Sequence, residues 1–169
     1  MGLAPRTHIQ GGRAMEQNAL IREVQRFFSL RELVDEPTYN KYGDFAWNFF
    51  RPELLETLLF IREHVLKVPM TINTWMTGGK FSERGLRHNM SVEVWKYTKA
   101  NKQFMSAHVL GAGVDFDAKG MTAAEVRSAI QAAAKRLPHP IRLEDGVSWV
   151  HIDVYNDGSK EKVQLFKVG

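Results

Sequence analysis

Two short stretches of this sequence carry most of its chemical information. They read Ser-Ala-His-Val-Leu-Gly-Ala-Gly-Val-Asp at residues 106–115 and Ser-Trp-Val-His-Ile-Asp at residues 148–153. Together they contain two histidines, His108 and His151, and the carboxylate of Asp115. Neutral imidazoles and a carboxylate are ligands that suit Zn²⁺. These three side chains are therefore candidate ligands of a single zinc ion.

The two stretches can meet only if the chain bends between His108 and Asp115. Gly111 and Gly113 allow such a bend, after which residues 112–117 alternate like a strand. If the strands at 112–117 and 148–155 are neighbours, His151 reaches the same point. Three protein ligands leave a fourth position for water, as in catalytic zinc sites. Spacing alone also fits a simpler interpretation, in which His151 is a half-buried strand histidine and Asp115 a turn acid.

The surrounding pattern predicts an α+β fold, a small mostly antiparallel sheet with flanking helices. Helical periodicity is present at residues 16–28 and from Pro52, and a Thr122–Glu125 capping box opens another helix. We expect strands at residues 68–75, 112–117, 141–146, 148–156 and 162–168, the last two joined as a hairpin. Residues 1–14 read as a flexible leader, and residues 15–169 as a single domain.

Composition excludes several classes of protein. The chain has 169 residues, a formal net charge of +4 and no cysteine, so disulfide scaffolds, thiolate zinc fingers and cysteine nucleophiles are ruled out. Its apolar stretches are too short to span a membrane, and its first residues lack the apolar segment of a secretory signal. The basic residues form no recognition-helix pattern, so we expect neither a nucleic-acid nor a membrane partner.

Taken whole, the pattern Ser-x-His-x-x-Gly-x-Gly-x-Asp followed by Trp-x-His resembles a family of zinc peptidases that cut D-amino-acid peptide bonds in bacterial cell walls. This family includes D-Ala-D-Ala carboxypeptidases, D-alanyl-D-alanine dipeptidases and phage L-alanyl-D-glutamate endopeptidases, and shares its fold with the hedgehog signalling domain. The resemblance covers about residues 68–156. Gly113 stands where the family usually has alanine.

The resemblance implies that His108, Asp115 and His151 are the zinc ligands. It implies that Ser106 borders the substrate cleft and that Trp149, on the same strand face as His151, flanks the metal. The family places an arginine upstream of the first histidine against the substrate. Here Arg84 and Arg87 are the two candidates for this role, with a solvated loop charge as the alternative for each.

The general base is the least defined residue. Several family members carry a glutamate three residues before the last histidine, but Ser148 occupies that position here. Glu144 and Asp153 are the nearest candidates. Asp153 shares a strand face with His151, so it could either accept a proton from water or orient the ligand. We rank Glu144 above Asp153.

These features predict a zinc metallopeptidase that hydrolyses D-amino-acid amides in peptidoglycan stem peptides, as a carboxypeptidase or an endopeptidase. We expect a monomer made in the cytoplasm without a signal peptide and acting on the cell wall, in the manner of a phage lytic protein. The alternative is a non-catalytic zinc-binding or cell-wall-binding module of the same fold. A basic nucleic-acid binder is a third and weaker hypothesis.

Overall fold

The computed structural model describes residues 9–155 and 158–167, and it has the predicted α+β class. Five strands form one mixed sheet in the order β1-β2-β4-β3-β5. The strands are β1 (Met70–Thr71), β2 (Gly113–Ala118), β3 (Ile141–Glu144), β4 (Val150–Asp153) and β5 (Val163–Phe166). Three of the four pairings are antiparallel, and β3 with β5 is parallel.

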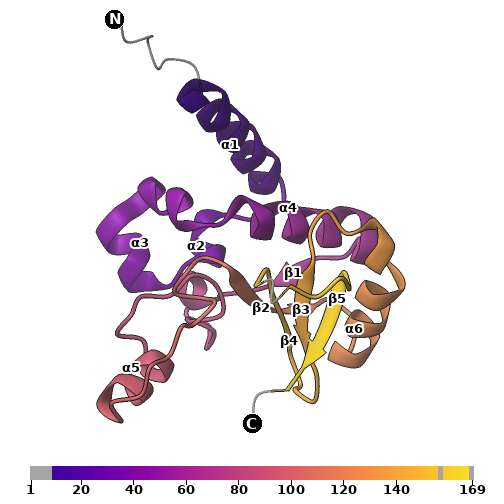
Figure 1. Cartoon of the computed structure of the whole chain (residues 1–169). Helices are drawn as coiled ribbons and strands as arrows, with labels where there is room; N and C mark the ends of the chain where they lie inside the picture. The colour runs from indigo at the N-terminus through magenta and orange to yellow at the C-terminus, as the bar shows by residue number, and fades with distance from the viewer. Residues whose placement is uncertain (1–8, 156–157, 168–169) are drawn as a thin grey trace, which may run out of the picture.

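Within the described residues, six α-helices and four short helical segments accompany this sheet (Figure 1). The α-helices are α1 (Ile9–Gln25), α2 (Leu30–Leu33), α3 (Glu36–Tyr42), α4 (Pro52–Phe60), α5 (Val92–Lys99) and α6 (Ala123–Ala132). The segments η1 (Gly43–Phe49), η3 (Trp75–Thr77) and η4 (Ala134–Arg136) are 3₁₀-helical, and η2 (Ile61–Leu66) is a π-helical continuation of α4. Among the described residues, no helix is both long and apolar enough to cross a bilayer.

The start of the chain differs from the prediction. Helix α1 begins at Ile9, so residues 9–14, expected to belong to a leader, are helical. Residues 1–8 lie outside the described residues. Helix α1 packs against α4 (Figure 1), and a contiguous hydrophobic core extends from Val24 at its end to Val154 after β4.

The predicted hairpin between the last two strands is wrong. Strand β4 already has β2 on one edge and β3 on the other, so β5 cannot pair with it. Strand β5 instead adds to the free edge of β3, where Ile141 lies opposite Val163. The turn residues Asn156 and Asp157 lie outside the described residues. The sequence pattern alone could not show that both edges of β4 were taken.

The sheet has one apolar and one polar face because side chains alternate along each strand. The apolar face contributes Val114, Phe116, Leu143, Val150 and Ile152, each at most 2 % exposed. Helix α6, opened by the predicted Thr122–Glu125 capping box, lies beside this face (Figure 1). The opposite face carries the candidate ligands.

Candidate metal centre

Three parts of the fold bring the candidate ligands together. Asp115 on β2 lies directly opposite His151 on β4, which confirms that these two strands are neighbours. His108 comes from the turn before β2. One potential ligand atom from each of His108, Asp115 and His151 lies within 4.8 Å of the other two. The three side chains are therefore close enough to hold a metal ion.

The turn that carries His108 depends on Gly111. This glycine has φ +63°, and a Cβ there would lie 1.9 Å from the carbonyl oxygen of Phe49. The Ala112 N–H donates to the Ala107 carbonyl at 2.8 Å and closes the bend. At Gly113 a Cβ would lie 2.8 Å from the Ala107 Cβ, so alanine there would displace the turn.

Hydrogen bonds outside the cluster orient both imidazoles. The Nδ1 of His108 is 2.9 Å from the Gly85 carbonyl, and the Nε2 of His151 is 3.1 Å from Asp153. If these nitrogens carry the protons, His108 Nε2 and His151 Nδ1 are left as the inward atoms, 3.3 Å apart. In each imidazole, one ring nitrogen then donates to an acceptor outside the cluster and the other points into it. This arrangement is typical of metal-binding histidines.

The charges of the cluster are strongly coupled. Burial lowers the pKa of His108 and would also lower that of His151, but Asp115 and Asp153 outweigh it and raise the pKa of His151 to about 9. Burial would raise the pKa of Asp115, yet both histidines hold it well below its ordinary value. His151 Nδ1 lies 2.6 Å from the Asp115 carboxylate, so a protonated His151 brings its positive charge to the point where the three side chains meet.

Asp153 lies behind His151. It is 0 % exposed, and Arg142 donates two hydrogen bonds to its carboxylate, at 2.9 and 2.8 Å. The Tyr155 N–H donates a third, at 3.0 Å. With these donors and His151 around it, this carboxylate is placed to orient the histidine, whereas a base must face the attacking water.

Glu144 has the character of a proton acceptor. It ends β3 on the same face as Arg142, and that strand runs beside β4, which carries His151. Its side chain is largely buried, and burial raises the pKa of its carboxyl group. Among the described residues, none donates a hydrogen bond to this carboxylate. Glu144 therefore remains a candidate base, whereas Arg142 and the Tyr155 N–H already bind the Asp153 carboxylate.

The two candidate arginines have different surroundings. The guanidinium of Arg84 lies over the Phe81 ring, 3.4 Å from its centroid, and pairs with Asp117. Arg87 is buried, and its Nη2 lies 3.7 Å from Asp115. Burial lowers the pKa of Arg87. Arg84 thus borders open space, whereas Arg87 supports a ligand carboxylate.

An open groove of about 540 Å³ reaches the cluster at Asp115. Its walls are Lys80, Phe81, Arg84, Asp117, Ser148 and Trp149. Trp149 is 36 % exposed, so its indole is available to a ligand. Ser106 is buried, is not in the groove wall, and its carbonyl accepts the Leu110 N–H at 3.2 Å.

Sequence reasoning missed three residues that shape the centre. Gly85 supplies the carbonyl behind His108, Arg142 holds Asp153, and Arg127 of α6 holds the loop before β4. The alternation of Arg142 and Glu144 on their strand was a usable signal for a polar sheet face. No signal in the sequence pointed to Gly85, because its role depends on a long-range chain crossing.

No protein-family model, curated protein or solved structure matches this chain. Its function must therefore be inferred from the site itself.

Proposed function

We propose that this protein is a zinc-dependent peptidase that hydrolyses amide bonds involving D-amino acids in bacterial peptidoglycan. The observation that carries the proposal is the convergence of His108, Asp115 and His151 at the end of an open groove. The resemblance of the two motifs to cell-wall peptidases supplies the substrate class, and with it the finer expectation of a hedgehog-type fold.

The donor set fits zinc. Two imidazole nitrogens and one carboxylate leave a coordination position open, and each histidine has an acceptor behind it. Zinc bound here would polarise the scissile carbonyl and lower the pKa of the attacking water. Asp153 and Arg87 would keep His151 and Asp115 in place during the reaction.

The remaining steps belong to side chains around the groove. Glu144 accepts a proton from the attacking water and passes it to the leaving amine. Arg84 and Lys80 bring positive charge to the groove, which suits a substrate carbonyl or carboxylate. The exposed indole of Trp149 packs against the substrate. Such a protein would act on the cell wall, as a phage lytic protein does.

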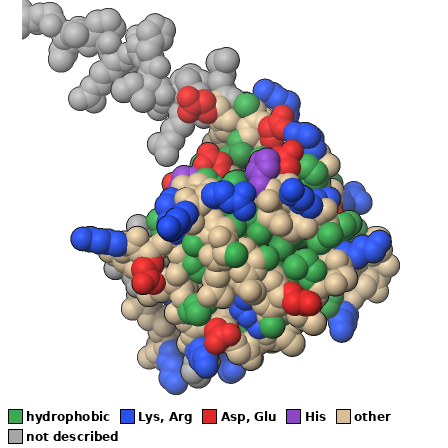
Figure 2. Space-filling view, turned by 90° about the vertical axis from the view of Figure 1, so that its right-hand side faces the viewer, with side chains coloured by type: hydrophobic (Ala, Val, Ile, Leu, Met, Phe, Trp, Pro, Cys, Tyr) green, Lys and Arg blue, Asp and Glu red, His purple; other side chains and the backbone are tan. Residues whose placement is uncertain are grey.

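A second candidate function is a non-catalytic module that binds zinc and the cell wall. It is favoured by one observation, that Ser148 occupies the place where the family has a carboxylate base. The nucleic-acid alternative gains nothing from the surface. On the face shown in Figure 2, Lys and Arg side chains are dispersed among acidic and apolar ones.

Metal analysis combined with mass spectrometry of digested muropeptides tests the proposal. The wild-type protein should bind one zinc and release amines from muropeptides, and a chelator should stop the release. His108→Ala and His151→Ala should lose both properties. Wild-type-like cleavage by either variant would refute the proposal, and stoichiometric zinc without cleavage would favour the binding module.

A further inference from the structure

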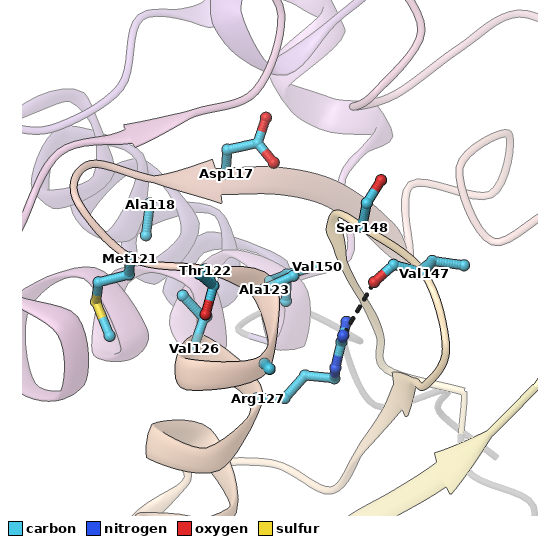
Figure 3. Close-up of a pocket in the computed structure, with 11 residues that line it drawn as sticks. Asp117, Ala118, Met121, Thr122, Ala123, Val126, Arg127, Val147, Ser148 and Val150 are labelled. Atoms are coloured by element: carbon cyan, nitrogen blue, oxygen red, sulfur yellow. Dashed lines mark hydrogen bonds between the residues drawn. The ribbon is translucent and has the colours of Figure 1, made fainter.

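A second hollow adjoins the groove at the metal centre. It has a volume of about 430 Å³ and lies between the end of β2, the first turn of α6 and the loop before β4 (Figure 3). Asp117 and Ser148 line both this hollow and the groove that reaches Asp115. The two depressions therefore meet at these two residues.

Apolar side chains provide slightly more than half of the surface of the second hollow. Its lining includes Met121, Ala123, Ala124, Val126 and Val147. With alanines on the first turn of α6, the space next to this helix stays open. Such a hollow suits a small apolar group, for example the methyl side chain of an alanine residue.

Arg127, the cation among the described residues that line the hollow, is already engaged. Its guanidinium donates to the backbone carbonyls of Val147 at 2.9 Å and Trp149 at 3.0 Å, the first of which is drawn in Figure 3. Asp145 lies 3.8 Å from its Nε. Arg127 thus holds the wall of the hollow in place, and its charge is not free to bind a terminal carboxylate.

From this geometry we propose that the hollow is a substrate subsite for a small apolar residue on one side of the scissile bond. The inference rests on the proposed peptidase function and deepens it. A peptide with its scissile amide at Asp115 enters the hollow by passing Asp117 and Ser148, beyond the last β2–β4 pair at Phe116 and Val150, to the α6 side of the sheet. Since Arg127, the cation among the described residues that line the hollow, is engaged, a continuing chain fits there better than a chain end, and we expect cleavage of an internal bond.

Substitutions at Ala124 test the subsite. Ala124→Trp fills the hollow, and Ala124→Asp puts a carboxylate into it while favouring the first turn of the helix through the helix dipole. Ala132→Trp, at an exposed alanine two turns later in the same helix and outside the hollow, is the matched control. Zinc content and thermal unfolding show that each variant is folded and loaded.

The probe is a synthetic stem peptide in two forms, one with free ends and one blocked by N-acetyl and C-amide groups. Wild type should cleave both forms with similar kcat/KM. Both Ala124 variants should lower kcat/KM about tenfold or more, mainly through KM, because the contact with one substrate residue is lost. Ala132→Trp should behave as wild type.

The possible failures are distinguishable. If zinc-loaded wild type cleaves neither form, the proposed function falls and the subsite with it. If wild type cleaves only the form with free ends, or if both Ala124 variants match Ala132→Trp, the subsite is overturned while the peptidase function stands.

Discussion

At the scale of single residues, three carboxylates at the candidate metal centre differ in their surroundings. Asp115 faces the inward nitrogens of both histidines, Asp153 lies behind His151, and Glu144 is buried without a hydrogen-bond donor among the described residues. In the proposed mechanism these three acidic side chains on one sheet face act as ligand, support and base. The differences come from partners and burial, since their chemical groups are the same.

Glu144→Gln should lower kcat by about 10²- to 10⁴-fold with zinc content unchanged, because the amide cannot accept the proton. Burial raises the pKa of Glu144 above its ordinary 4.5. The carboxylate therefore forms only at higher pH, and the acidic limb of the wild-type rate profile should lie above pH 4.5. Steady-state kinetics across pH measure both effects. Asp145→Asn is the control, and an unchanged kcat in Glu144→Gln would remove this residue from the base role.

Asp153→Asn should weaken zinc binding by about 10- to 100-fold, because the amide supports the basicity of His151 less well. The loss should be seen in competition titrations with a chromophoric chelator. Asp117→Asn is a matched control on the same sheet face, since Asp117 pairs with Arg84 and contacts neither histidine. Equal zinc affinity in both variants would show that Asp153 does not support zinc binding by His151.

At the scale of elements, the turn before β2 is the part on which the ligand geometry depends most. It must reverse the chain within a few residues and place His108 beside Asp115. The backbone of Phe49 comes so near Gly111 that no side chain fits. A ligand turn is therefore held by the segment before α4, more than fifty residues earlier in the chain.

Gly111→Ala should lower the free energy of unfolding by at least about 2 kcal/mol, from left-handed backbone strain and the clash with Phe49. Gly120→Ala shares the positive φ, +75° against +63°, but meets no atom within 4 Å. It should cost only the strain, about 1–2 kcal/mol. Denaturant titrations measure the free energy of unfolding of both variants, and the difference between their losses is the cost of the clash. Equal losses would mean that the turn can move away from Phe49.

At the scale of the whole molecule, the metal centre joins the two halves of the chain. The Leu86 N–H donates to Leu33 at 2.8 Å, and the Asp35 N–H donates to Leu86 at 2.9 Å. These bonds fix Gly85, whose carbonyl orients His108. The N-terminal helices therefore support the ligands at a distance, and metal binding should stabilise the entire fold.

Removing zinc should accordingly lower the melting temperature. Zinc at a hundredfold excess over its Kd stabilises a folded protein by about 2.7 kcal/mol, which corresponds to roughly 5–10 °C for a chain of this size. Scanning calorimetry with and without a chelator measures the shift. His151→Ala should show no shift with chelator. A shift of wild-type size in that variant would place the stabilising metal elsewhere.

The sequence by itself determined the alternation of the strands, the capped helix at Thr122 and the α+β class, because these depend on local periodicity and caps. It also singled out His108, Asp115 and His151, since the motifs list the ligand types in order. Tertiary structure alone decided that β5 joins β3 and not β4. It alone placed Arg87 against Asp115 and Gly85 behind His108. Those outcomes depend on which backbones cross in space, and contacts between residues distant in sequence leave no local pattern to read.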